Sequence, residues 1–282
     1  MTPFTLVDTH SHLHFSDFKN DIDAVLDRAR AAGVALIVVG TLQKTSTEAV
    51  VFAQAHEHIW AAIGLHPNNI HEIHPNEDEG SGSENFDYEF YKNLARNDKV
   101  VAIGETGMDF FRIPDGLDRT MVIADQEKIF RRHLDLCDEL NKPVIIHCRD
   151  AHDEVIAVLT EYITAGKLAR RGVLHCFTGS AEQGARYVSL GMYISIPGII
   201  TFPPKKSEHE NSLNAVVRTI PRDRLLVETD CPYLTPVPHR GERNESAYVI
   251  HTVQKIAEIL NASFEEIARE TSQNARALFQ IE

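Results

Sequence analysis

Histidines and acidic residues recur at the ends of short apolar runs along this sequence. The first run ends in His10-Ser11-His12, and the last ends in Glu228-Thr229-Asp230. Neutral imidazoles and carboxylates are the ligands that Mg²⁺, Mn²⁺ and Zn²⁺ take in proteins. Buried together without a cation, the carboxylates would repel one another and the imidazoles would lack partners. The donors that end such runs and could hold a metal ion are His10, His12, Glu105, His147, His175 and Asp230.

The size of this donor set indicates more than one metal ion. A single histidine at a strand end is more often solvated or hydrogen bonded than a ligand. Six donors at five strand ends exceed the three or four protein ligands of one open catalytic zinc. Two ions about 3.5–4 Å apart, bridged by one carboxylate and a water molecule, account for the whole set. We therefore predict two divalent metal ions (Mg, Mn or Zn).

The apolar runs predict the elements that position these donors. They are rich in Val, Ile and Leu without alternation, which is typical of strands covered on both faces. Eight runs separated by helical patterns predict an α/β fold, a single-domain (β/α)8 TIM barrel over residues 1–282 with its active site at the carboxyl ends of the strands. An open doubly wound sheet is the alternative, but no glycine-rich phosphate loop follows the first run. The runs are 6–12, 35–40, 59–66, 100–105, 143–147, 172–175, 192–195 and 225–230.

Helical patterns fill most of the segments between the runs. The final helix is predicted to begin with a capping box formed by Ser263 and Glu266. Residues 76–85 are acidic and rich in glycine and serine, which predicts a flexible surface loop. The predicted helices are 22–32, 47–56, about 87–97, 118–140, 151–168, 181–190, 211–219, 245–260 and 264–279.

The composition restricts both the partner and the compartment. The 282 residues include 28 Lys and Arg against 41 Asp and Glu, a net charge of −13. Proteins that bind nucleic acid along a wide track usually present a basic field, so a nucleic acid would be held here only locally. No apolar run reaches the ~18 residues of a membrane span, and the first residues show no signal-peptide pattern. Four cysteines suit a reducing compartment, so we expect a soluble, cytoplasmic protein without a membrane partner.

Six motifs in this sequence resemble those of the TatD-type metal-dependent deoxyribonucleases, a branch of the amidohydrolase superfamily. The resemblance covers nearly the whole chain, and the motifs occur in the order of the family. The motifs are Asp8-Thr9-His10-Ser11-His12-Leu13, Gly64-Leu65-His66-Pro67, Gly104-Glu105-Thr106-Gly107-Met108-Asp109, His147-Cys148-Arg149-Asp150-Ala151, His175-Cys176-Phe177-Thr178-Gly179-Ser180 and Glu228-Thr229-Asp230-Cys231-Pro232-Tyr233-Leu234.

The resemblance implies a divalent-metal-dependent nuclease acting on DNA. It implies one metal ion held by His10, His12, Glu105 and Asp230. Glu105 would bridge to a second ion, which His147 and His175 would hold. Asp230 and Glu105 are the predicted catalytic residues, and we expect Asp230 to orient the attacking water and accept its proton. The family also suggests 3′–5′ exonuclease action on single-stranded or frayed ends of DNA, and the sequence leaves open whether RNA strand ends are bound as well.

Polar and aromatic residues near the same strand ends are candidates for binding the substrate. Arginines there could contact phosphates, and Phe110, Phe111 or Tyr233 could stack on unpaired bases. Asp8 and Glu228 could orient ligand imidazoles, or they could simply be buried acids bonded to backbone amides. The candidate substrate-binding residues are His66, Arg112, Arg149, Tyr233 and Arg240, and Arg243 is a further rim cation.

Two alternatives stay open on the sequence. The first is an amidohydrolase-type deacylase or esterase, acting on an amide, lactone or aminoacyl ester at the same two-metal site. Several cations at the rim favour a phosphodiester, whereas an apolar pocket would favour an acyl substrate. The second is a non-catalytic binding module, against which the intact donor set argues.

Overall fold

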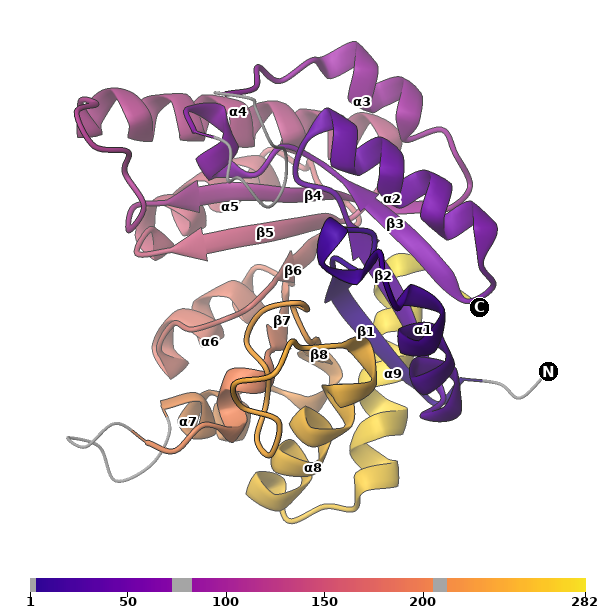
Figure 1. Ribbon diagram of the computed structural model, residues 1–282. Helices are drawn as coiled ribbons and strands as arrows, with labels where there is room; N and C mark the ends of the chain where they lie inside the picture. The colour runs from indigo at the N-terminus through magenta and orange to yellow at the C-terminus, as the bar shows by residue number, and fades with distance from the viewer. Residues whose placement is uncertain (1–3, 73–82, 205–211) are drawn as a thin grey trace. The chain divides into compact units, whose positions relative to one another are not determined.

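The computed structural model describes residues 4–72, 83–204 and 212–282 (Figure 1). Its strands form one sheet in the order β1-β2-β3-β4-β5-β6-β7-β8, and the paired strands β3 to β6 and β7 to β8 are parallel. This order confirms the predicted alternation of strands and helices. The strands are β1 (Leu6–Ser11), β2 (Val34–Val39), β3 (Ile59–Ile63), β4 (Val100–Asp109), β5 (Val144–Arg149), β6 (Gly172–Leu174), β7 (Tyr193–Ile196) and β8 (Leu225–Val227).

The strands are buried almost without interruption. Every residue of β1, β2 and β4 is buried, which explains why β2 and the first four residues of β4 are apolar at consecutive positions rather than at alternate ones. The predicted carboxyl ends of β3, β4 and β8 were wrong by three or four residues. β4 continues past Glu105 to Asp109, whereas β3 and β8 end at Ile63 and Val227, so that His66 and Asp230 lie on the segments that follow them.

The helices follow the predicted pattern, with differences at their first turns. The second helix begins at Gln43 rather than at residue 47, because the Thr45 hydroxyl accepts the Leu42 backbone N–H at 2.9 Å and caps the helix four residues earlier. The Ser263 hydroxyl accepts the Glu266 backbone N–H at 3.1 Å, which is one half of the predicted capping box, whereas the Glu266 carboxylate accepts from Arg222 at 2.8 Å. The helices are α1 (Ile22–Ala31), α2 (Gln43–Ala55), α3 (Tyr88–Leu94), α4 (Arg119–Leu140), α5 (His152–Thr164), α6 (Ala181–Ser189), α7 (Ser212–Thr219), α8 (Val249–Leu260) and α9 (Phe264–Phe279).

The chain divides into two compact units. The first contains the described residues of 1–13, 17–37 and 175–282, and in it α9 packs against β1 and β8 (Figure 1). The second contains the described residues of 14–16 and 38–174, and in it α2 packs against β3 and the long helix α4 packs against β4 (Figure 1). Of the predicted loop 76–85, residues 76–82 lie outside the described part of the chain. Within the described ranges, no helix is both long and apolar enough to span a membrane.

Close approaches of the backbone bring the functional segments of the second unit together. A Cβ on Gly64 would lie 2.7 Å from the carbonyl carbon of Gly104, so β4 and the segment after β3 touch where only glycine fits. Gly107 has φ +143°, and a Cβ there would lie 2.0 Å from the carbonyl oxygen of His147. The backbones that carry His66, Glu105 and His147 are therefore held close to one another.

Candidate metal centre

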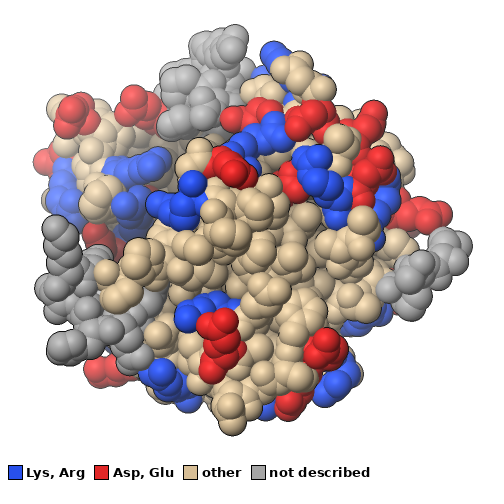
Figure 2. Space-filling view, turned by 60° about the horizontal axis from the view of Figure 1, so that its bottom comes forward, with Lys and Arg blue, Asp and Glu red and all other residues tan. Residues whose placement is uncertain are grey.

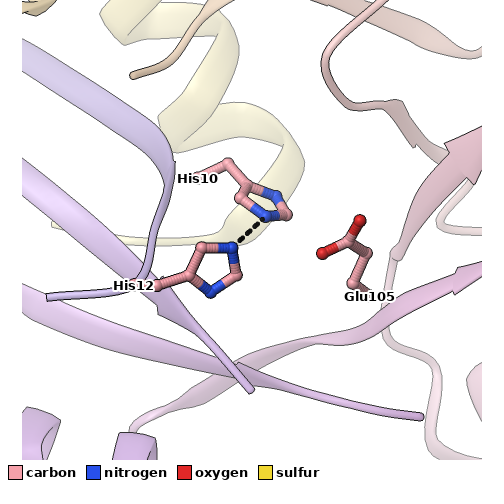
Figure 3. A group of neighbouring side chains, drawn as sticks. All are labelled: His10, His12 and Glu105. Carbon is pink, nitrogen blue, oxygen red and sulfur yellow. Dashed lines mark hydrogen bonds between the residues drawn. The ribbon is translucent and has the colours of Figure 1, made fainter. Parts of the chain in front are cut away.

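In the first unit, His10 and His12 extend from the carboxyl end of β1 toward Asp230. Figure 3 shows the two imidazoles with their Nε2 atoms facing each other at 3.3 Å, and it also draws Glu105, which extends from β4. The Asp230 backbone N–H donates to the His10 carbonyl at 2.9 Å, and the His12 N–H donates to the Cys231 carbonyl at 2.8 Å. These backbone bonds bring the Asp230 Oδ1 atom to 3.8 Å from His10 Nε2 and 3.5 Å from His12 Nε2.

His175 completes this group from the segment after β6. Its ring stacks on that of His10 with a centroid distance of 3.9 Å and an interplanar angle of 15°. The ligand atoms of His10, His175 and Asp230 lie within 4.8 Å of one another. Burial raises the pKa of Asp230, but the His12 hydrogen bond and the neighbouring imidazoles outweigh burial and leave that pKa below its ordinary value. The group therefore offers nitrogen atoms and a charged carboxylate, which suit a divalent cation.

Glu228 and Asp8 lie behind these donors in different roles. The Oε1 atom of Glu228 is 3.5 Å from His175 Nδ1 and accepts the Cys176 backbone N–H, so Glu228 is placed to orient the His175 ring. Asp8 instead accepts the backbone N–H of Thr229 at 2.9 Å and its hydroxyl at 2.6 Å, which joins β1 to the segment after β8. Burial raises the pKa of Asp8 to about 7.

In the second unit, Glu105 lies between two histidines. Its Oε1 atom is 3.0 Å from His147 Nδ1 and 3.3 Å from His66 Nε2. The ligand atoms of these three residues lie within 4.8 Å of one another, and Glu105 itself is buried. Two nitrogen donors and one carboxylate oxygen again match the preferences of a divalent cation.

The hydrogen bonds of His66 determine which of its nitrogens carries the proton. Its Nδ1 atom accepts the Asn68 backbone N–H at 3.2 Å, so the proton of the neutral ring is on Nε2. The Nε2–H group lies 3.3 Å from Glu105 Oε1. In this arrangement His66 serves as a hydrogen-bond donor, whereas ligation of a metal ion through Nε2 would require the proton to leave that nitrogen.

Asp109 is a residue of this group to which the sequence argument assigned no role. It is buried at the end of β4, and its Oδ2 atom lies 3.1 Å from His147 Nε2. Burial raises the pKa of Asp109, but the hydrogen bond and charge of His147 and the backbone N–H of Arg112 outweigh burial and hold that pKa well below its ordinary value. Burial lowers the pKa of His147, while Asp109 and Glu105 together raise it above its ordinary value. Residues 105, 107 and 109 share one face of a strand, and this parity could have identified Asp109.

The predicted substrate-binding arginines fall into two classes. Arg149 lies over the Phe111 ring at 3.7 Å and Arg240 over the Phe202 ring at 3.8 Å. The guanidinium groups of these two arginines and of exposed Arg112 form no ion pair with any residue in the described ranges. Arg243 instead forms a two-pronged pair with Asp21 at 2.9 and 2.6 Å and is tied into the fold.

Tyr233 lies beside His12, and the cysteines lie outside the groups of metal donors. Tyr233 is half exposed, and its ring meets His12 edge-on at 6.3 Å. All four cysteines lie within the described residues and are free thiols, with Cys137 and Cys231 buried. None belongs to the donor groups that could hold a metal ion in the described part of the chain.

The face drawn in Figure 2 agrees with a local rather than an extended contact to an anion. On the face drawn in Figure 2, basic side chains occur in separate groups, most of them with acidic neighbours, around a broad area with neither. No continuous basic track crosses the described part of that face. Binding along a long phosphate backbone would require one.

Known proteins resemble this chain over its whole length. A family model described as "TatD related DNase" matches residues 7–280. The "Uncharacterized metal-dependent hydrolase YabD" of Bacillus subtilis is 40% identical over 277 residues, covering 98% of this chain and 99% of that protein. The "3'-5' ssDNA/RNA exonuclease TatD" of Salmonella typhimurium is 34% identical over 282 residues, covering 98% of this chain and 99% of that protein.

The structural likeness agrees with these relatives and confirms the predicted fold class. The crystal structure of YJJV, a TatD homologue from Escherichia coli K12, matches with a TM-score of 0.83 at 29% identity and covers 99% of both chains. The sequential strand order and this likeness identify a (β/α)8 TIM barrel. The chain therefore belongs to the TatD-related DNase family and is a metal-dependent hydrolase.

Proposed function

We propose that this protein is a divalent-metal-dependent deoxyribonuclease that acts as a 3′–5′ exonuclease on single-stranded or frayed DNA ends, with RNA as a further substrate. The observation that carries the proposal is the pairing of buried nitrogen and carboxylate donors with an uncommitted cation. Arg149 lies two residues beyond His147 on β5 and has no carboxylate partner among the described residues. A phosphate is the anion that such a cation beside a divalent-metal site would bind.

We assign the donors as the sequence argument did. His10, His12, Glu105 and Asp230 would hold one divalent ion, and His147 and His175 would hold a second one that Glu105 bridges. Mg, Mn and Zn all accept this donor set. When bound, these ions supply the Lewis acidity that activates water and neutralises charge on phosphate oxygens.

The chain's own residues would divide the remaining work. Asp230, charged and bonded to His12, orients the attacking water and accepts its proton. The Nε2–H group of His66 points toward Glu105. From there it can donate a hydrogen bond to a phosphate oxygen of the substrate. Asp109 and Glu228 hold the rings of His147 and His175 in fixed orientations.

The proposed mode of action fits the charge of the molecule. An exonuclease binds only the end of a strand, which a protein with a net charge of −13 can do through a few local cations. A relative at 34% identity bears the name 3′–5′ ssDNA/RNA exonuclease, which supports the polarity and the substrate. We further propose that residues 1–282 act as a single domain, and the four free thiols support a cytoplasmic setting.

A gel time course with a 5′-labelled single-stranded oligonucleotide tests the proposal. The metal-stripped protein would receive Mg²⁺, Mn²⁺ or Zn²⁺ separately, beside the variants Asp230→Asn and His147→Ala. We expect a metal-dependent ladder that shortens by one nucleotide at a time and is absent in both variants. An intact oligonucleotide in every lane, together with turnover of ester, lactone or amide substrates, would favour the deacylase alternative instead.

A further inference from the structure

An exposed phenylalanine lies directly after the strand that carries Glu105 and Asp109. Phe111 is 61% exposed, whereas its neighbour Phe110 is buried with 7% exposure. A large ring exposed to this extent loses the stabilisation that burial would provide. Of the two candidate aromatic residues here, the geometry retains only Phe111 for contact with a substrate.

A cation covers one face of the Phe111 ring and leaves the rest open. The Arg149 guanidinium carbon lies 3.7 Å from the ring centroid, within the range of a cation–π contact. With the guanidinium on one face, the exposure of the ring comes from the opposite face and the edge. The donors of Arg149 have no carboxylate partner in the described part of the chain. The pair thus presents an open aromatic face beside a free cation.

One carboxylate fixes this pair relative to the candidate metal donors. Asp109 Oδ1 accepts the backbone N–H groups of Phe111 at 3.0 Å and Arg112 at 2.9 Å. Asp109 Oδ2 lies 3.1 Å from His147 Nε2. The Phe110 N–H donates to the Arg149 carbonyl at 2.8 Å, and Asp109 pairs with Arg149 in the register of β4 and β5. A rigid hydrogen-bond network, rather than a free loop, therefore positions the ring and the guanidinium beside His147.

We propose that Phe111 and Arg149 form a nucleobase-binding subsite, in which an unpaired base stacks on the open face of Phe111 and the adjoining phosphate pairs with Arg149. The proposal rests on the proposed nuclease function and deepens it. Aromatic rings stack on every base because every base has a π face. A base in a duplex is already stacked on both sides, so this subsite accepts only single-stranded or unpaired nucleotides, without regard to their sequence.

Oligonucleotides with single missing bases test the subsite. A series would carry one abasic residue at the first, second or third position from the 3′ end, and KM would be compared with that of the intact strand. In the wild type, the abasic residue that falls on the subsite raises KM about 5- to 150-fold, the range for one base–aromatic stack. Phe111→Ala removes this dependence of KM on the abasic position, and Phe111→Trp keeps it. Phe111→Leu also removes it, because leucine is apolar but has no π face. Val51→Ala, at a 60% exposed position on α2, is the matched control and behaves like the wild type.

A binding measurement separates failure of the subsite from failure of the proposed nuclease function. In the Asp230→Asn background, a strand with 2-aminopurine at the sensitive position loses fluorescence on binding because the base stacks. Adding Phe111→Ala abolishes this quenching. If no oligonucleotide is cleaved with any metal, the nuclease proposal fails while the quenching still decides the subsite. Equal quenching with and without the ring, or unchanged abasic discrimination in Phe111→Ala, would overturn the subsite and favour a protein partner for the exposed ring.

Discussion

Replacement of Asp109 by asparagine tests whether the carboxylate behind His147 determines how firmly that ring is held for a metal ion. The Oδ2 atom of Asp109 lies 3.1 Å from His147 Nε2 and 3.3 Å from the Asn68 side-chain nitrogen, which donates to it. In Asp109→Asn, the Oδ1 position still accepts the Phe111 and Arg112 amides. The new amide nitrogen, however, faces two other nitrogen groups. The change removes the acceptor of His147 without creating a cavity.

The size of the effect follows from the type of bond that is lost. A hydrogen bond to a charged group contributes about 1.5–3 kcal/mol, which corresponds to a factor of roughly 10 to 150 in an equilibrium constant. Partners behind metal-bound histidines typically contribute 10- to 100-fold to metal affinity or activity. We therefore expect Asp109→Asn to weaken binding of one metal ion about 10- to 100-fold.

Calorimetric titration of the metal-stripped protein with Mn²⁺ measures this effect directly. Asp135→Asn, at a half-exposed acid of α4 in the same unit, is the matched control and keeps the affinity of the wild type. Thermal unfolding shows whether each variant is folded. A folded Asp109→Asn protein that binds Mn²⁺ as tightly as the wild type would refute the orienting role of Asp109.

Further substitutions test the other roles. His66→Gln should lower kcat while the Mn²⁺ affinity stays near that of the wild type, because His66 acts as a hydrogen-bond donor through Nε2. A loss of affinity as large as that of His147→Ala would make His66 a ligand. Arg149→Met should reduce the slope of the logarithm of the single-strand binding constant against the logarithm of the salt concentration by about 0.7. An unchanged slope would exclude a contact between Arg149 and a phosphate. Burial lowers the pKa of His133 to about 3, below the value of about 6.5 in the unfolded chain. The contribution of neutral His133 to the free energy of unfolding is therefore complete above pH 6.5 and is lost as the pH falls toward 3. From pH 7.5 to 5 the wild type should lose about 2 kcal/mol of unfolding free energy through this residue; urea unfolding should show a smaller loss in His133→Gln, and equal losses would contradict the assignment.

Local patterns in the sequence were sufficient to predict most elements and most of the donors. β2, buried along its whole length, appears as an unbroken apolar run, and both β1 and β2 match the predicted positions to within one residue. His10 and His12 follow from parity, because residues two apart in a strand share a face. Their approach to Asp230 depends on backbone bonds between β1 and the segment after β8, which join residues more than two hundred positions apart.

The residues that sequence reasoning missed or misjudged depend on contacts between segments. Asp109 was overlooked because β4 was expected to end at Glu105, which placed Asp109 on a loop rather than on the same strand face. Arg243 looked like a rim cation until the fold placed Asp21 against it. The proton position on His66 depends on the Asn68 amide and is not visible in a motif. Long-range hydrogen bonds, rather than residue types, decide these roles.

The central claim is that these donors hold two divalent metal ions. Counting the metal ions that the protein binds tests this claim most directly, because the count does not depend on a substrate. Metal-stripped wild type, His10→Ala and His147→Ala would be titrated with Mn²⁺, with free Mn²⁺ followed by electron paramagnetic resonance and bound metal by mass spectrometry. The account predicts two ions per wild-type chain and loss of at least one ion in each variant. A wild type that binds no Mn²⁺, Mg²⁺ or Zn²⁺, or variants that bind as many ions as the wild type, would contradict it.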